Sequence, residues 1–420
     1  MSGALTAPRS ALAEPTERPG KLWIAAMCLL NAGIMIAFFV PIQVLLAQQA
    51  DAIVPGAKEV TLAWTTAAGA LSSTIFNPVW GALSDRTLSR FGRRVPWIFA
   101  GVVAAIAALL LLSTASSVAG LVTGWVLSQA AINAIFAPIV AAVPDQVPVA
   151  QRGVVGGMVA MSQTVGVALG SAIPMLTGSV RAGYLVVVVL LGLSALPYLL
   201  HSRDVPLTRS ELQLARSRDE QRKRAPIDEQ IRRDFRWAFI TRFLMQFGNA
   251  LMLLFMLYFL QDGLQLGRAN AEKGVFTLTA IYAAMTVITA IIGGVASDRI
   301  GKRKPFVIGS GIVVALAFVV LMFASTFAGV MVGAVVMGLG FGMYQAVDFA
   351  LITQVLPEAE GRGRDMGILN IAAALPQVAA PLVSILLILG YGVSYPLLFL
   401  TAALVSLLGA VLVHRIKTVA

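Results

Sequence analysis

Predominantly apolar segments recur along the whole chain and are separated by short polar segments. Each apolar segment holds about 20 residues or more, the length that an α-helix needs to cross the hydrocarbon core of a bilayer. The predicted spans cover residues 22–46, 60–83, 95–113, 117–143, 154–178, 181–200, 235–260, 274–296, 305–325, 328–356, 366–389 and 392–413. The pattern predicts an all-α integral membrane protein with twelve transmembrane helices.

The composition agrees with a membrane protein and excludes a soluble enzyme. Of the 420 residues, 58% are hydrophobic and 12% are charged, whereas about 25% are charged in a typical soluble domain. Cys28 is the one cysteine, so an intrachain disulfide and a cysteine metal cluster are excluded. The sequence contains no nucleotide-binding loop and no nucleophile paired with a base. We therefore predict no enzymatic activity, no cofactor and no metal.

The positive charges lie on one side of the predicted membrane. The net charge is +11, and 26 of the 31 Lys and Arg residues fall in the tails and in alternate loops. The opposite loops hold four, and Arg242 lies within a span. Since cytoplasmic segments are enriched in Lys and Arg, this asymmetry predicts that both termini lie in the cytoplasm. The expected location is the plasma membrane, or the inner membrane if the protein is bacterial. The asymmetry also explains the basic charge without a nucleic-acid partner.

An internal repeat divides the chain into two halves. The segment GALSDRTLSRFGRRVPW begins at Gly81 and GGVASDRIGKRKPF begins at Gly293, so that Asp85 and Asp298 are 213 residues apart. Pro144 and Pro357, in a second matching pair of loops, have the same separation. The predicted organisation is a cytoplasmic tail, a six-helix bundle, a cytoplasmic linker, a second six-helix bundle and a tail, over residues 1–21, 22–200, 201–234, 235–413 and 414–420.

The repeated loop has the pattern G-x-x-x-D-R-x-G-[RK]-[RK], by which the chain resembles the major facilitator superfamily over nearly its whole length. The resemblance implies a secondary transporter that works by alternating access. The acidic and basic residues of the two loops are predicted to form a latch that closes the cytoplasmic side, with the Asp near a helix N-terminus. The predicted gating residues are Gly81, Asp85, Arg86, Gly92, Arg93, Arg94, Gly294, Asp298, Arg299, Gly301, Lys302 and Arg303.

The branch of the superfamily is indicated by details of the loops. The first loop is longer than the second, and together with the segments NPVWGALSDR and NIAAALPQ it resembles the glycoside and sucrose cation symporters. Gln129, however, stands where such symporters carry an intramembrane acid. The marks of drug antiporters are incomplete, because Val126 replaces an Arg in span 4 and Ser171 replaces a Pro in span 5.

Two charged residues lie well inside predicted spans. Asp348 is about 12 Å from the cytoplasmic end of span 10, and Arg242 is about 10 Å into span 7. A charge inside a bilayer costs roughly 2.5–3.5 kcal/mol on insertion scales, so we predict that this pair takes part in proton coupling. The alternative is a fixed ion pair that only joins the two helices.

Uncharged polar side chains within the spans form the predicted substrate site. Amides can both donate and accept hydrogen bonds and an aromatic ring can stack, a combination that suits a polyhydroxylated solute. The predicted substrate-binding residues are Asn31, Trp125, Gln129, Asn133, Gln246, Asn249, Tyr344, Gln345 and Gln377. The alternative for each amide is a hydrogen bond between helices.

These patterns together favour proton-coupled symport of a polar, sugar-like small molecule by a monomer in the lipid bilayer. A proton-coupled exporter of drugs or metabolites is the first alternative. A non-transporting membrane sensor is the second, although the 201–234 segment is too short and polar to form a sensing domain.

Overall fold

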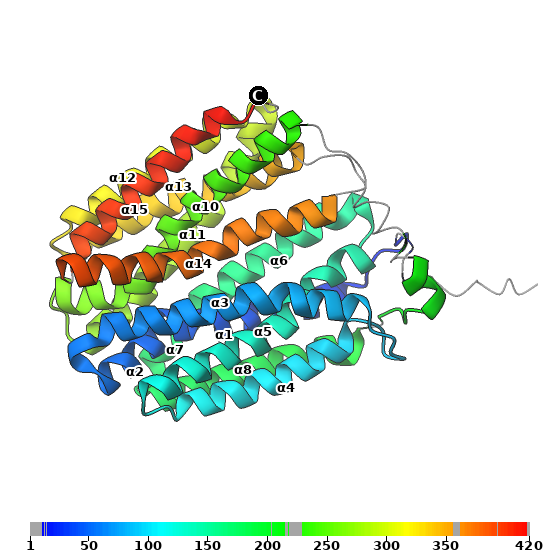
Figure 1. The fold of residues 1–420 in the computed structure, drawn as a ribbon, viewed down its shortest axis with the longest axis horizontal. Helices are drawn as coiled ribbons and strands as arrows, with labels where there is room; N and C mark the ends of the chain where they lie inside the picture. The colour runs from blue at the N-terminus through cyan, green and yellow to red at the C-terminus, as the bar shows by residue number, and fades with distance from the viewer. Residues whose placement is uncertain are drawn as a thin grey trace, which may run out of the picture.

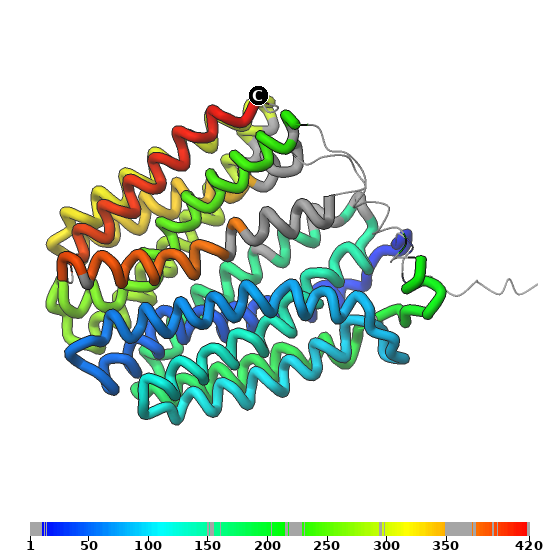
Figure 2. The backbone as a smooth tube through the Cα atoms, in the orientation of Figure 1, coloured from blue at the N-terminus to red at the C-terminus, as the bar shows by residue number. Residues whose placement is uncertain are grey.

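The computed structural model describes residues 11, 13, 15–202, 204–214, 217, 229–355, 362–392 and 394–417. Its helices run roughly parallel to one long axis (Figure 1). We call the end that carries the α3–α4 loop, the α11–α12 loop and residues 204–214 the linker end. The opposite end, where α2 is followed by α3, is called the distal end. Figure 2 traces the same path as a tube.

The first group of helices comes from the first half of the chain. α1 (Lys21–Val40) continues through a π-helical turn, η1 (Pro41–Leu45), into α2 (Leu46–Ile53), and a short 3₁₀ turn, η2 (Pro55–Ala57), leads to α3. The remaining helices are α3 (Lys58–Asp85), α4 (Val95–Ser113), α5 (Val118–Gln146), α6 (Val149–Gly170), α7 (Ile173–Thr177) and α8 (Val180–His201). Within this group α5 packs on α3 and α4, and α1 packs on α6 and α8.

The second group repeats this pattern. α10 (Glu229–Tyr258) ends in another π-helical turn, η3 (Phe259–Gly263), at the distal end. The other elements are α11 (Arg268–Ile300), α12 (Lys304–Phe323), α13 (Phe327–Val355), α14 (Arg362–Tyr391), α15 (Tyr395–Leu412) and the turn η4 (Val413–Arg415). Here α13 packs on α11 and α12, and α15 packs on α10 and α12. The two groups meet where α3 contacts α14, α6 contacts α11, and η1 contacts α10.

The predicted all-α membrane fold is confirmed. Ten helices in the described part of the chain are long and apolar enough to span a membrane. The other two predicted spans correspond to α3 and α14, helices of 28 and 30 residues. α3 is rich in Ser and Thr, and the apolar part of α14 is the shorter stretch Leu375–Ile388.

Several boundaries differ from the predicted ones, and three of the differences have a clear physical reason. The first span extends past residue 46 to Ile53 because the π-helical turn keeps the chain helical. The fifth span is broken after Gly170, since Pro174 has no N–H and its ring would clash with the carbonyl of Gly170. α10 begins at Glu229, inside the segment predicted to be the linker, because its first turns are polar and escape a hydropathy window.

Candidate functional site

The two predicted intramembrane charges meet inside the second group of helices. Arg242 on α10 places Nη1 3.4 Å from Oδ2 of Asp348 on α13. Asp348 is 8% exposed. Gln246 lies one turn beyond Arg242 and Tyr344 one turn before Asp348, and because the two helices are antiparallel both are displaced toward the distal end. The structure thus brings together four of the predicted residues.

This cluster carries buried polar atoms that lack a hydrogen bond within the described part of the chain. Nε of Arg242 and Oε1 of Gln246 have no partner there, and Nη1 of Arg242 has only the ion pair with Asp348. Buried polar atoms are nearly always paired, so each exception points to water, an ion or a ligand. The region around the ion pair is therefore suited to a polar solute.

In the first group of helices, two of the predicted substrate residues join helices to one another. The Asn31 side chain donates to the Met27 carbonyl at 2.9 Å and accepts from Gln163 Nε2 on α6 at 2.9 Å. Asn133 donates to Ser73 Oγ and accepts from Asn77 Nδ2, both at 2.8 Å and both on α3. These hydrogen bonds correspond to the helix-joining alternative.

The remaining predicted residues have mixed environments. Trp125 is fully buried and, with Gln129, packs against α3 at Gly69, where an added side chain would overlap the indole. Asn249 accepts a hydrogen bond from the Tyr282 hydroxyl at 3.3 Å. Gln345 is exposed and Gln377 is half-buried.

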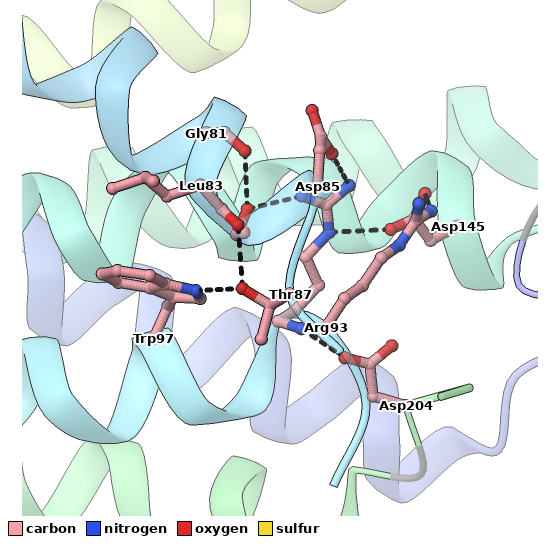
Figure 3. Close-up of polar contacts among 10 residues, drawn as sticks. Gly81, Leu83, Asp85, Thr87, Arg93, Trp97, Asp145 and Asp204 are labelled. Atoms are coloured by element: carbon pink, nitrogen blue, oxygen red, sulfur yellow. Dashed lines mark hydrogen bonds and ion pairs between the residues drawn. The ribbon is translucent and has the colours of Figure 1, made fainter. Parts of the chain in front are cut away.

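Figure 3 shows the polar contacts that hold the first repeated loop, with Asp85, Arg93, Asp145 and Asp204 among the residues drawn. Arg94 pairs with Asp85 through Nη2 at 2.6 Å and donates to Asp145 Oδ2 at 2.9 Å and to Ser84 Oγ at 2.6 Å. Arg93 pairs with the other oxygen of Asp145 at 2.6 Å. The loop therefore ties the linker ends of α3, α4 and α5 together, and both Arg93 and Arg94 are buried while Arg86 is exposed.

Asp204, just after α8, completes this cluster. Its carboxylate accepts the backbone N–H of Arg94 at 2.5 Å, at the positive end of the α4 dipole. Burial raises the pKa of the Asp204 carboxyl, and the backbone hydrogen bond from Arg94 opposes that effect. Gly92 has φ +87°, and a side chain there would overlap Asp204. The loop thus depends on a glycine at this position.

We expect Gly92→Ala to lower the melting temperature of the purified protein by a few degrees, because alanine disfavours a positive φ by about 1–2 kcal/mol and would also displace Asp204. Gly81→Ala is the matched control within the same loop motif. A Cβ at Gly81 meets open space, so this variant should melt at or above the wild-type temperature. Equal melting temperatures for the two variants would contradict the described role of Gly92.

The second repeated loop shares one backbone feature with the first. Gly301 ends α11 with φ +70°, the left-handed conformation that glycine adopts without strain. Arg299 and Lys302 are exposed, and Arg303 precedes α12 and is half-buried. Gly294 and Asp298 lie outside the residues whose side chains are described.

At the distal end, polar side chains join the two groups of helices. We call Gln48, Lys58, Tyr258, Asp262 and Glu272 the distal clasp. Lys58 pairs with Asp262 at 2.9 Å and lies 5.0 Å from the centre of the Tyr258 ring. The Tyr258 hydroxyl donates to the Ala47 carbonyl at 2.8 Å, and Gln48 Nε2 donates to Glu272 at 2.6 Å. Each contact crosses between the halves.

Sequence reasoning missed several of these residues. Asp145 lies in the second pair of matching loops, so the repeat itself was a signal for it. The clasp residues sit at the ends of predicted spans, where polar residues are expected in any case and carry no distinctive pattern. Asp204 lies in a polar segment and had no signal of its own.

Comparison with known proteins supplies the wider context. Residues 22–279 and 270–418 match the family model of the Major Facilitator Superfamily. Among solved structures, a D-xylose-proton symporter has a TM-score of 0.72 and 13% identity, covering 96% of this chain and 98% of that one. The human organic anion transporter MFSD10 (TETRAN) has a TM-score of 0.66 and 16% identity, covering 94% of this chain and 100% of that one. Comparison with curated protein sequences found no match.

Proposed function

We propose that this chain, which belongs to the Major Facilitator Superfamily and is a multi-pass membrane transporter of a small molecule, works by proton-coupled symport of a polar, sugar-like solute. The D-xylose-proton symporter has the same fold as this chain. Its name describes symport of a sugar with protons, which is the activity proposed for this chain. The glycoside and sucrose symporter branch, indicated by the long first loop, is part of the same proposal.

The observation that carries the proposal is the Arg242–Asp348 pair with its unsatisfied neighbours. A proton on Asp348 removes its charge and weakens its attraction to Arg242. The guanidinium is then available to hydrogen bond with a solute that also reaches Gln246 and Tyr344. Loss of the solute lets the pair re-form and favours release of the proton. Protonation and solute binding are thereby linked at one place.

We further propose the arrangement in which this site works. Residues 22–200 and 235–413 act as two halves that rock about the site, joined by residues 201–234. The linker end faces the cytoplasm together with both termini, and the distal end faces outward. The loop at Asp85–Arg94 stabilises the cytoplasmic end, and the distal clasp closes the outer end. The transporter acts as a monomer in the plasma membrane.

Sidedness is tested by cysteine labelling in intact cells. With Cys28 replaced by serine, a cysteine introduced at the exposed Lys273 should react with an impermeant maleimide added outside, because this residue lies at the distal end. A cysteine at Arg90, exposed at the linker end, should react only after the cells are permeabilised. Reaction at position 90 in intact cells would contradict the proposed orientation.

Direction of coupling is tested in energy-depleted cells in a weakly buffered medium. Adding a transported solute should alkalinise the medium, since protons enter with the solute during symport. Candidate sugars are screened first by uptake of labelled compounds into sealed vesicles. Acidification of the medium on addition of solute would instead show exchange and overturn the proposal of symport.

The alternative is export of a drug or metabolite in exchange for protons. Two observations favour it: Gln129 replaces an intramembrane acid, and the helices around the site carry apolar side chains such as Met252 and Met256. The organic anion transporter MFSD10 shares the fold, and an unpaired Arg242 would suit an anionic solute. The medium pH experiment separates this alternative from symport.

A further inference from the structure

Three glutamine side chains are buried near the distal end of the first half, and their surroundings differ. Gln49 is bonded within its own half, because Nε2 donates to a carbonyl of α4 at 2.9 Å and Oε1 accepts from the Tyr184 hydroxyl at 2.8 Å. Gln48 is bonded across the halves, to Glu272. Gln43 is 3% exposed, and among the described residues neither Nε2 nor Oε1 of its side chain has a hydrogen-bond partner. An unpaired buried amide is therefore particular to position 43.

Gln43 lies where the two halves meet. It belongs to the π-helical turn η1, which contacts α10, and it lines a cavity of about 30 Å³ whose other walls come from the second half. Most of those walls are Met, Leu, Val and Ala side chains, with hydroxyl groups from Thr279 and Tyr282. The Tyr282 hydroxyl already donates to Asn249. Closure of the distal end thus surrounds the Gln43 amide with mostly apolar groups.

Burial of the amide in these surroundings costs free energy. A polar group that leaves water without gaining a hydrogen bond is destabilising, and this amide carries both a donor and an acceptor. A water molecule in the cavity would need two to four polar partners, of which the walls supply few. When the halves part at the distal end, the walls from the second half move away and water hydrates the amide again. The cost therefore falls on the closed form alone.

We propose that Gln43 is a positioning residue of the outer gate, which opposes closure of the distal end and so sets how readily the transporter opens outward. The distal clasp and Gln43 then act in opposite directions, since the clasp stabilises the closed form and the unpaired amide destabilises it. Without Gln43 the clasp would hold the distal end shut for longer, and each transport cycle requires that end to open. This inference rests on the proposed rocking of the two halves and does not depend on which solute is carried.

The test applies one substitution to all three glutamines. Methionine keeps the length and the unbranched shape of glutamine and removes both polar atoms. The full chain, with Cys28 replaced by serine, carries spin labels on cysteines at Gly56 and Gly267, one on each half at the distal end. Distances between the labels are measured in lipid nanodiscs by double electron–electron resonance, without added solute. The ratio of the short-distance to the long-distance population then gives the ratio of closed to open forms.

The three variants should give three different results. Gln43→Met should favour the closed form about tenfold, because it removes an unpaired donor and acceptor. Gln48→Met should favour the open form about fivefold, because it removes a hydrogen bond that crosses between the halves. Gln49→Met should lower the melting temperature and leave the ratio within about twofold, since its hydrogen bonds lie within the first half. An unchanged ratio in Gln43→Met, or a shift toward the open form, would overturn the inference.

A second substitution at the same position should act in the opposite direction. Gln43→Glu has nearly the shape of the native residue, but burying an ionised carboxylate costs more than burying an amide, so the open form should be favoured. A general loss of packing would move both variants the same way, and that result would overturn the inference. To keep the open population measurable, both are also compared in the Asp262→Lys background, where the reversed charge faces Lys58.

The outcomes separate this inference from the proposed function. Since the measurement needs no solute, failure of sugar symport would leave the role of Gln43 standing. Two distances in the native sequence, with a ratio that Gln43→Met does not alter, would reject the role of Gln43 alone. A single distance in every variant, including Asp262→Lys, would contradict the rocking of the halves, and this inference would fail with it.

Discussion

Replacing Asp348 by asparagine is expected to abolish accumulation of solute driven by a pH gradient, so that the ratio of internal to external solute falls to one. The amide has nearly the shape of the carboxyl group but cannot take up or release a proton. Exchange of labelled for unlabelled solute should continue, because that process needs no net movement of protons. Both quantities are measured in proteoliposomes, the first with an imposed pH gradient and the second without one.

Asp348→Glu is the matched control, since it keeps a titratable carboxyl group opposite Arg242 and should retain part of the accumulation. If Asp348→Asn accumulates solute normally, Asp348 has no part in coupling. Loss of exchange as well as accumulation in the asparagine variant, with a lowered melting temperature, would instead identify the pair as a contact that only joins α10 and α13.

Reversal of one charge in the distal clasp is expected to open the distal end. Asp262→Lys places two cations together where Lys58 and Asp262 are now 2.9 Å apart. Because the Lys58 side chain is 15% exposed and that of Asp262 is 40% exposed, solvent screens the effect, and we expect a change of about 1–2 kcal/mol between the closed and open forms. That change corresponds to a shift of roughly five- to thirtyfold in their ratio.

Opening is measured as the distance between spin labels at Gly56 and Gly267, which lie on opposite halves and where added side chains meet open space. The longer-distance population should grow in Asp262→Lys. Exchanging both charges, with Lys58→Asp combined with Asp262→Lys, should restore the shorter distance. If the double variant opens as far as the single one, the effect comes from general disturbance and not from the ion pair.

The helical fold could be predicted because a helix that crosses the lipid bilayer must be long and apolar. In the described structure, ten of the predicted spans are long and apolar enough to do so. The π-helical turns at residues 41–45 and 259–263 could not be predicted, since they change backbone hydrogen bonding and leave hydropathy unaltered. The polar first turns of α10 were likewise assigned to the linker. Hydropathy indicates whether a segment lies in lipid or in water, whereas the ends of a helix are determined by hydrogen bonds.

The candidate site could be predicted from the sequence at those positions where burying a charge costs much free energy. A charge within an apolar span has few explanations, which is why Arg242 and Asp348 could be singled out together. The roles of Arg242 and Asp348 in proton coupling remain predictions. For Asp145 the repeat was the one signal, whereas Asp204 and the charged clasp residues lie near helix ends, where a charge costs little free energy and gives no signal. Their partners are distant in sequence, so only the packing of the helices reveals these contacts.

The two π-helical turns have a consequence for the register of their helices. Each bonds residue i to residue i+5, as in Leu46 N–H to the Pro41 carbonyl and Leu264 N–H to the Phe259 carbonyl, and so holds one residue more than an α-helical turn. Every residue beyond η1 is therefore rotated by about 100° from where an uninterrupted α-helix would place it. Deleting one residue from this turn would rotate Gln48 away from Glu272 without changing either side chain. In each half, the first helix thus faces its own bundle before the π-helical turn, and the residues after the turn face the opposite half.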